Sequence, residues 1–117
     1  IRVLALYPSH DLNFGYQSNL CIYRIVQEFL TNTAKHSNAS ELKFSLSELS
    51  GTLFELLLED DGRGFEVKQL FTQQSGLGMS GMKRRAESMG ATFELQSFPK
   101  DGTRIRMQWS KGDGVHV

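Results

Sequence analysis

The sequence predicts an α+β domain, a two-layer α/β sandwich in which helices cover one face of a mostly antiparallel, mixed sheet. Two periodicities lead to this prediction. Apolar and polar residues alternate in several short runs, as in half-buried strands, and apolar residues recur every three or four positions elsewhere, as in helices. The predicted order is strand, helix, two strands, helix, two strands, and the tight turns between consecutive strands favour antiparallel pairing.

The first part of the chain contains a strand and a long helix. Residues 1–7 are mostly apolar and suit a strand, whereas residues 8–15 contain Pro, Asp, Asn and Gly and suit a loop. A helix is predicted over residues 18–36, with Ser18 or Asn19 as its cap. Its apolar stripe follows helical spacing and consists of Ile22, Ile25, Val26, Phe29, Leu30 and Thr33.

Four further strands are predicted. Residues 42–46 alternate as in a half-buried strand, and residues 53–59 form a more continuous apolar run, as expected for a central strand. Residues 93–95 and 105–109 form the arms of a final hairpin, with its turn at residues 99–102. The alternating polar residues of the last strand favour a solvated outer face; they are Arg104, Arg106 and Gln108.

The second helix follows a loop and a glycine-rich stretch. Residues 65–75 are polar and mixed and are predicted to be a loop, and residues 76–81 contain three glycines. The helix that follows is predicted to run to Met89, with Gly90 as its C-terminal cap.

Length and composition limit the functions that the chain can have. Its 117 residues suffice for one domain, predicted over residues 1–110, with a flexible tail at 111–117. The formal net charge is zero, which argues against binding nucleic acid or a membrane surface. The single cysteine, Cys21, excludes an internal disulfide and fits a reducing cytoplasm. The chain starts without Met and is expected to be a piece of a longer parent protein.

The first stretch that could bind a metal or a ligand lies on the long helix. Glu28, Asn32, Lys35 and His36 fall within a stripe about 100° wide, beside the apolar stripe. An acid and an amide oxygen one turn apart can organise a hydrated Mg²⁺, and the two cations can meet phosphates bridged by that metal. The alternative is a solvated helix edge with polar pairs one turn apart.

The second stretch is the run DDGRG at residues 60–64, directly after the apolar strand. The carboxylate of Asp60 can accept a hydrogen bond from the exocyclic amine of adenine, and the alternate glycines Gly62 and Gly64 let the backbone approach a flat ligand. A tight acidic turn is the alternative. A calcium loop would need further oxygen ligands and a closing Glu that are missing here.

The third stretch is GLGMSG at residues 76–81, which matches G-x-G-x-x-G. Glycines at a helix start leave backbone N–H groups free to meet an anion. The motif comes late in the chain and an antiparallel hairpin follows it, which excludes a Rossmann unit, and no Gly-Lys-Ser/Thr indicates a P-loop. Thr103, at the start of the last strand, could join Asp60 around a base, although an ordinary turn is the alternative.

Together, the order and spacing of these stretches resemble the GHKL superfamily of gyrase-type ATPases, Hsp90, MutL and histidine kinases, which have the Bergerat ATP-binding fold. The E-x-x-x-N box matches residues 28–32, the D-x-G-x-G box residues 60–64 and the G-x-G-x-x-G box residues 76–81. Gly102-Thr103 matches the Gly-Thr element. The resemblance covers nearly the whole chain, from about Leu20 to Trp109.

Two details are similar to histidine kinases in particular. Residues 32–36 give N-x-x-K-H, and residues 76–90, GLGMSGMKRRAESMG, resemble kinases related to nitrate and nitrite sensors, whose partners are NarL-type response regulators. Phe29 stands where relatives usually have a small residue, and its side chain is expected to face the core. Asp61 is often Asn in relatives, which leaves its role open.

The resemblance implies roles for the matching positions. Asn32 would ligate Mg²⁺ and Glu28 would position the water shell of the metal, so these two are the catalytic and metal-binding candidates. Lys35 and His36 would approach the phosphates of ATP.

The remaining candidates would bind the nucleotide. Asp60 would accept a hydrogen bond from the adenine amine, with Thr103 nearby. Gly62 and Gly64 would let the backbone lie close to the base. The hinged lid over the phosphates would consist of Gly76, Leu77, Gly78, Met79 and Gly81.

The resemblance further implies a function. The chain would bind Mg·ATP and present its γ-phosphate to a histidine on a separate helical dimerisation domain of the same parent, as a two-component histidine kinase does. The setting would be the cytoplasm, in a parent that could be anchored in the bacterial inner membrane, and the isolated domain would bind ATP but transfer little. The alternatives are a GHKL ATPase, an anti-sigma serine kinase, or a non-catalytic ATP-binding interaction module.

Overall fold

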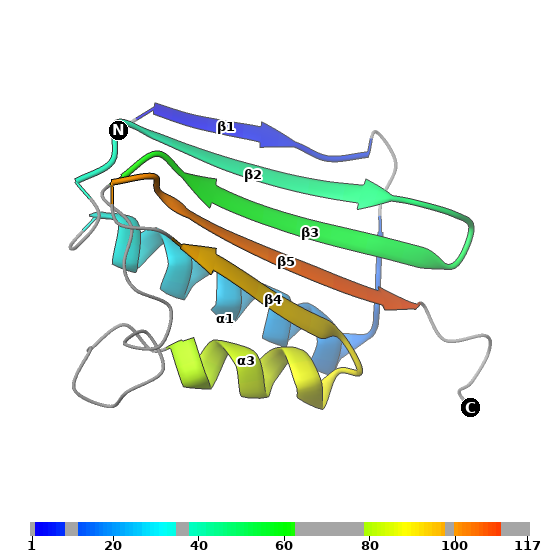
Figure 1. The fold of residues 1–117 in the computed structure, drawn as a ribbon. Helices are drawn as coiled ribbons and strands as arrows, with labels where there is room; N and C mark the ends of the chain where they lie inside the picture. The colour runs from blue at the N-terminus through cyan, green and yellow to red at the C-terminus, as the bar shows by residue number, and fades with distance from the viewer. Residues whose placement is uncertain (1, 9–11, 35–37, 63–78, 98–99, 111–117) are drawn as a thin grey trace.

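The computed structural model describes residues 2–8, 12–34, 38–62, 79–97 and 100–110. These residues form one five-stranded sheet with helices on one of its faces, the predicted α+β sandwich (Figure 1). The strands are β1 (Arg2–Leu6), β2 (Glu41–Glu48), β3 (Leu53–Asp60), β4 (Thr92–Ser97) and β5 (Thr103–Ser110), and the helices are α1 (Tyr16–Asn32) and α3 (Met79–Ser88). The predicted tail at residues 111–117 lies outside the described residues.

The sheet is mixed and mostly antiparallel, as predicted. The strands follow the order β1-β2-β3-β5-β4; β1 pairs with β2 in parallel, and the other neighbours are antiparallel. The parallel pair arises because α1 connects β1 to β2, as a crossover must. β3 is central, as its continuous apolar run predicted, and this position brings its last residue against the start of β5.

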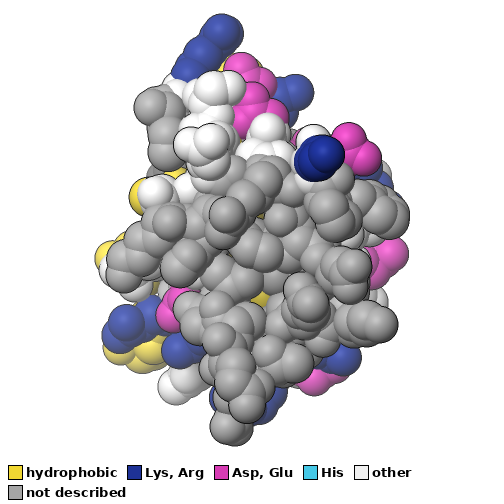
Figure 2. Space-filling model, turned by 60° about the vertical axis from the view of Figure 1, so that its left-hand side comes forward, with side chains coloured by type: hydrophobic (Ala, Val, Ile, Leu, Met, Phe, Trp, Pro, Cys, Tyr) yellow, Lys and Arg dark blue, Asp and Glu magenta, His cyan; other side chains and the backbone are white. Residues whose placement is uncertain are grey.

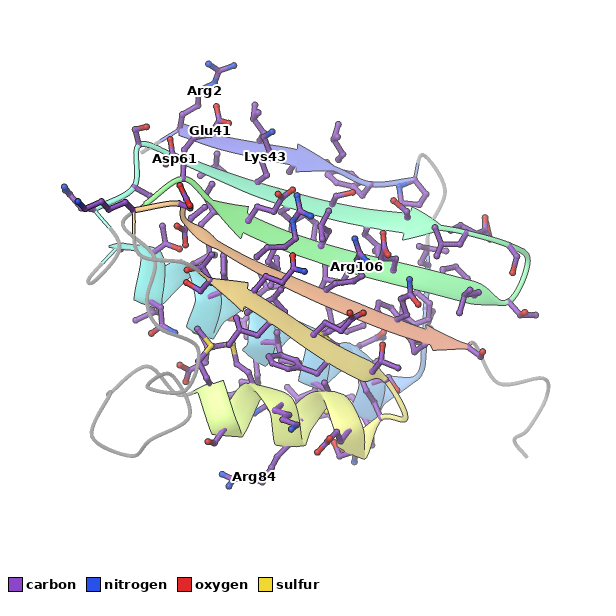
Figure 3. All side chains as sticks on the ribbon, in the orientation of Figure 1. Arg2, Glu41, Lys43, Asp61, Arg84 and Arg106 are labelled. Carbon is purple, nitrogen blue, oxygen red and sulfur yellow. The ribbon has the colours of Figure 1, made fainter. Side chains whose placement is uncertain are left out.

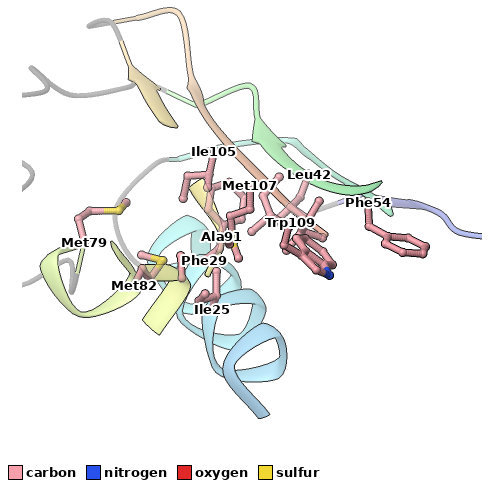
Figure 4. Packing of buried hydrophobic residues seen from close by; sticks show 13 residues of the cluster. Ile25, Phe29, Leu42, Phe54, Met79, Met82, Ala91, Ile105, Met107 and Trp109 are labelled. Carbon is pink, nitrogen blue, oxygen red and sulfur yellow. The ribbon is translucent and has the colours of Figure 1, made fainter. Parts of the chain in front are cut away.

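The core lies between the sheet and the two helices (Figure 4). Ile25 and Phe29 of α1 are buried in the core cluster, and Phe29 faces the core as expected. From α3, Met79, Met82 and Ala86 are buried in the same cluster. Full burial of a large apolar side chain contributes about 1.5–3 kcal/mol, so these few contacts fix the helices on the sheet.

The opposite face of the sheet is polar. Arg104 donates two hydrogen bonds to Glu59 on the neighbouring strand, at 3.0 and 2.8 Å. Gln108 donates to Glu55 at 2.8 Å, and Arg106 lies 3.5 Å from the same carboxylate (Figure 3). Cross-strand pairs of this kind suit a solvated face, as the alternation of β5 predicted.

The start of α1 differs from the prediction. The helix begins at Tyr16 and its cap is Gly15, with φ 92° and ψ 158° and no side-chain cap. Asn19 lies inside the helix, and its Oδ1 accepts the backbone N–H of Phe14 at 3.1 Å. Asn13 Oδ1 accepts from Gly15 N–H and from Asn19 Nδ2, at 2.9 and 3.0 Å. The prediction of Ser18 or Asn19 as the cap is therefore wrong, because Asn13 and Asn19 brace the loop instead.

The other helix ends are closer to the predictions. The regular part of α1 ends at Asn32 rather than at residue 36, and Lys35 and His36 lie outside the described residues. α3 ends at Ser88, one residue before the predicted end. The predicted cap, Gly90, has φ 79°; its N–H bonds the carbonyl of Glu87 at 3.0 Å, and Ala91 N–H bonds that of Ala86 at 2.9 Å.

Neither helix in the described part of the chain has the length and apolar content that crossing a membrane requires.

Candidate functional site

Three segments meet at one end of the sheet. Asp60, the last residue of β3, is paired in register with Thr103, the first residue of β5. From the end of α1, Thr33 Oγ1 donates to Asp60 Oδ2 at 3.4 Å. Two of the predicted site positions, Asp60 and Thr103, are therefore adjacent, as expected, and the end of α1 contacts Asp60.

Asp60 is held as a partly buried hydrogen-bond acceptor. Gly62 N–H donates to its Oδ1 at 2.8 Å, and the backbone N–H of Thr103 donates to it as well. Burial raises the pKa of Asp60 above its ordinary value of 3.8, and the bonds from Gly62 and Thr33 offset part of that increase. A desolvated carboxylate gains more than an exposed one from a further donor, so this group suits a ligand amine.

The end of α1 places the predicted acid and amide on one side. Asn32 is buried, and Glu28, one turn earlier, is half-buried. Because Asn32 directly precedes Thr33, it lies close to the group that holds Asp60. Within the described residues no cluster of three His, Cys, Asp or Glu side chains could hold a metal.

The glycine-rich candidates are only partly described. Gly62 is buried beside Asp60, whereas Gly64, Gly76, Leu77 and Gly78 lie outside the described residues. The other two lid candidates belong to α3.

Met79 and Gly81 lie in the first turn of α3 rather than in a hinged loop. The side chain of Met79 is buried in the core, so only its backbone could contact a ligand. A Cβ added at Gly81 would meet only the tip of Arg85, at 3.4 Å. In the described structure, the fold itself does not require glycine at position 81.

Gly81→Ala is therefore expected to raise the free energy of unfolding by about 0.5–1 kcal/mol, because alanine costs less chain entropy in a helix. If the phosphates approach this turn closely, ATP affinity falls in the same variant. Thermal unfolding and ATP titration of the variant separate the two effects, and a fall in melting temperature would show that position 81 is packed more tightly than the structure indicates.

Asp61 has a structural role that the sequence left open. Its Oδ1 accepts the backbone N–H groups of Ser40 and Glu41, both at 2.9 Å, and its Oδ2 accepts Ser40 Oγ–H at 2.6 Å. The hydrogen bond from the Ser40 side chain lowers the pKa of Asp61. Figure 3 shows Asp61 beside Glu41 at the start of β2. The two neighbouring carboxylates thus have different tasks: Asp61 fixes the start of β2, and Asp60 faces the site.

Among the described glycines, Gly102 makes the closest backbone contact, which the sequence did not predict. It has φ 84°, and a Cβ there would overlap the carbonyl oxygen of Asp60 and lie 3.3 Å from Asp61 Cα. This contact joins two backbone segments, whereas the approach of the backbone to a flat ligand at Gly62 and Gly64 stays a prediction. The signal in the sequence was the Asp-Gly turn pair before Thr103.

Two polar depressions flank Asp60 at this end of the sheet, with volumes of about 170 and 190 Å³. The first is lined by Glu59, Asp60, Gln96, Asp101, Gly102, Thr103 and Arg104, and the second by Glu41, Lys43, Glu59, Asp60, Asp61 and Asp101. In Figure 2, among the described residues, acidic and basic side chains both lie near this end of the molecule. Both linings include Glu59, which pairs with Arg104 on the solvated face, so these depressions lie on that side of the strand ends.

Comparison with known proteins identifies the family of the chain. The profile of the family described as histidine kinase-, DNA gyrase B- and HSP90-like ATPases matches residues 18–113. The sensor protein VraS of Staphylococcus epidermidis is 39% identical over 87 residues, which are 74% of this chain and 24% of that protein. The chain thus spans about a quarter of the length of that relative.

Solved structures share the fold. A blue-light activated histidine kinase from Erythrobacter litoralis superposes with a TM-score of 0.79 at 20% identity, over 97% of this chain and 36% of that one. The catalytic domain of the histidine kinase ThkA gives a TM-score of 0.74 at 14% identity, over 94% and 78% of the two chains. At such identities the likeness confirms the predicted α+β architecture.

Proposed function

Since the chain belongs to the family of histidine kinase-, DNA gyrase B- and HSP90-like ATPases, we propose that it binds Mg·ATP as the catalytic domain of a two-component sensor histidine kinase. The observation that carries the proposal is the position of Asp60. It is a partly buried acceptor fixed by Gly62 and Thr103 and touched by the end of α1.

The proposed binding mode divides the nucleotide between two groups of residues. Asp60 accepts a hydrogen bond from the adenine amine, beside Thr103. Asn32 ligates Mg²⁺ and Glu28 orients the water shell of the ion, since carbonyl and carboxylate oxygens are the donors that Mg²⁺ prefers. When bound, the metal neutralises charge on the phosphates during transfer. Lys35, His36, Gly64 and the glycine-rich lid, with the backbone at Met79 and Gly81, complete the phosphate end.

In the proposed reaction, the bond between the β,γ-bridging oxygen and the γ-phosphorus of ATP breaks, and a bond from a histidine nitrogen to that phosphorus forms. ADP leaves with the electron pair of the broken bond, and the proton that the imidazole gives up passes to solvent water. The acceptor lies on a helical dimerisation domain of the same parent, and a NarL-type response regulator acts downstream. This domain contributes position and electrostatics rather than a covalent intermediate.

We further propose that residues 1–110 form the ATP-binding domain, that 111–117 are a tail, and that the domain works in the cytoplasm.

The test is calorimetric titration of ATP into the chain, with Mg²⁺ and with EDTA, followed by incubation with γ-labelled ATP and a separately supplied helical dimerisation domain. We expect binding that Mg²⁺ strengthens, and label that appears on a histidine of the added domain. Label on a serine would indicate an anti-sigma type kinase, and release of phosphate alone would indicate an ATPase. Absence of binding by the folded chain would refute the proposal.

The raised pKa of Asp60 gives a pH dependence with a defined sign. A protonated Asp60 cannot accept as a carboxylate, so ATP affinity should fall about tenfold per pH unit once the pH drops below that raised pKa, which lies above 3.8. Stability responds in the opposite direction: because the folded state holds this proton more tightly, the contribution of Asp60 to stability rises as the pH falls toward 3.8.

The measurement is the dissociation constant for ATP from pH 7 down to pH 3.8, the ordinary pKa of this carboxyl, compared with that of Asp60→Asn, since the titration of ATP itself is common to both proteins. Parallel pH profiles in the two proteins would contradict the assignment of Asp60.

A further inference from the structure

A chain of hydrogen bonds behind the site links Ser97, the last residue of β4, to the first residues of β5. Ser97 Oγ donates to the carbonyl oxygen of Gly102 at 3.2 Å and lies 2.9 Å from Thr103 Oγ1. Ser97 and Thr103 are buried residues, 2% and 5% exposed. Such burial leaves protein atoms as their main partners and makes the direction of each bond important.

The direction of the chain follows from the donors available. A hydroxyl has one proton, and a carbonyl oxygen can only accept. If Ser97 gave its proton to Thr103, the bond to Gly102 would be lost. If Thr103 donates to Ser97, and Ser97 donates to Gly102, both bonds form and each strengthens the other. The second arrangement satisfies more groups and is therefore favoured.

This direction determines what Thr103 can offer to a ligand. With its proton directed at Ser97, Thr103 Oγ1 presents only lone pairs. Asp60, its register partner across the strands, also presents only lone pairs when ionised. The end of β3 and β5 is thus a pair of acceptors, which suits a ligand group with two N–H donors and disfavours a carbonyl oxygen.

We propose that Ser97 is a positioning residue that holds the Thr103 hydroxyl as an acceptor and thereby makes the site select a 6-amino purine over a 6-oxo purine. The inference rests on the proposed nucleotide-binding function and adds to it the residue that sets the selectivity. Ser97 would act only through Thr103, without touching the base.

The experiment compares ATP with inosine triphosphate, which has a 6-oxo group and an N1–H donor where ATP has a 6-amino group and an N1 acceptor. Dissociation constants for both are measured on the unaltered chain and on Ser97→Ala. We expect the variant to lose about fivefold to tenfold of the preference for ATP, the size of one neutral hydrogen bond, because the freed Thr103 proton can turn toward the 6-oxo group. Ser97→Cys fills nearly the same space with a weak acceptor and should show the same direction if Ser97→Ala does not fold.

Two variants of Thr103 test whether Ser97 changes the nucleotide preference through the Thr103 hydroxyl. Thr103→Val removes the hydroxyl, so adding Ser97→Ala should then change nothing in the preference; Thr103→Ser keeps the hydroxyl, so the effect of Ser97→Ala should return. Equal weakening of both nucleotides by Ser97→Ala, or an undiminished loss of preference in Thr103→Val, would overturn the inference while leaving the proposed function intact. If the unaltered chain bound neither nucleotide, the proposed function would fail and the inference with it.

Discussion

Replacing Asp60 with Asn is expected to weaken ATP binding roughly 10- to 100-fold, because a hydrogen bond to a charged acceptor contributes about 1.5–3 kcal/mol. Asn has nearly the same shape, but its amide also carries N–H donors, and one of them would face the amine of the base or the N–H of Gly62, which donates to Asp60 at 2.8 Å. The fold should survive, since the neutral Asn avoids the free-energy cost of burying a charge, the same cost that raises the pKa of Asp60.

Asp61→Asn is the matched control. Both variants remove one charge at adjacent positions, but Asp61 lines only the second depression, and its oxygens already accept hydrogen bonds from Ser40 and Glu41. It should lower the melting temperature, because it weakens three hydrogen bonds that fix the start of β2, and should leave ATP affinity within about twofold. Calorimetric titration and thermal unfolding of both variants decide the matter, and equal losses of affinity would mean that the effect is one of net charge.

The sequence predicted the layout of the fold because the layout depends on patterns that the chain carries locally. The alternation in β2 and β5 and the helical spacing in α1 identified each element, and the continuous apolar run of β3 identified the central strand. The start of α1 was wrong because its support is not a local cap. Asn13 and Asn19 bond across a loop whose path is fixed by Phe14, which packs edge-on against Phe54 with ring centroids 4.9 Å apart.

The candidate site was predicted as a set of residue types, but not as an arrangement. Asp60 and Thr103 could be named from their motifs, and their adjacency follows from a register between β3 and β5 that the sequence does not specify. Asp61 bonds Ser40, which is distant in sequence, and Ser97 bonds Thr103 through a pair of hydroxyls, which is a common pairing. No sequence pattern predicts either contact. The backbone contact between Gly102 and Asp60 was not predicted, because it depends on the pairing of two strands that are distant in sequence.

Gly102→Ala should be the most destabilising single-methyl change in the described part of the chain, with a loss of about 3 kcal/mol or more in the free energy of unfolding. Two costs add. A left-handed backbone, with φ 84°, costs alanine about 1 kcal/mol, and the new methyl group would overlap the carbonyl oxygen of Asp60. That oxygen is backbone in the central strand of the sheet, so it cannot rotate away as the end of a side chain can.

Substitutions at two other glycines separate the cost of the left-handed backbone from the cost of the steric overlap. Gly90 has a similar φ of 79° with nothing within 4 Å of an added Cβ, so Gly90→Ala measures the backbone cost alone. Gly51 has equal space and no left-handed φ, so Gly51→Ala should change little. The excess loss in Gly102→Ala over Gly90→Ala, measured by urea unfolding, is the cost of the overlap with Asp60. A loss equal to that of Gly90→Ala would show that β3 and β5 can separate at this point at little cost.

A separation of β3 from β5 at this point would also affect function, because it would change the distance between the two acceptors, Asp60 and Thr103. Any movement that relieves the methyl group at Gly102 moves Thr103 away from Asp60, since the two residues are register partners and the Thr103 N–H bonds the Asp60 carboxylate. Gly102→Ala should therefore weaken ATP binding even at temperatures where the variant is fully folded, whereas Gly90→Ala should not. A folded Gly102→Ala chain with unchanged ATP affinity would mean that the nucleotide does not depend on the junction between these two strands.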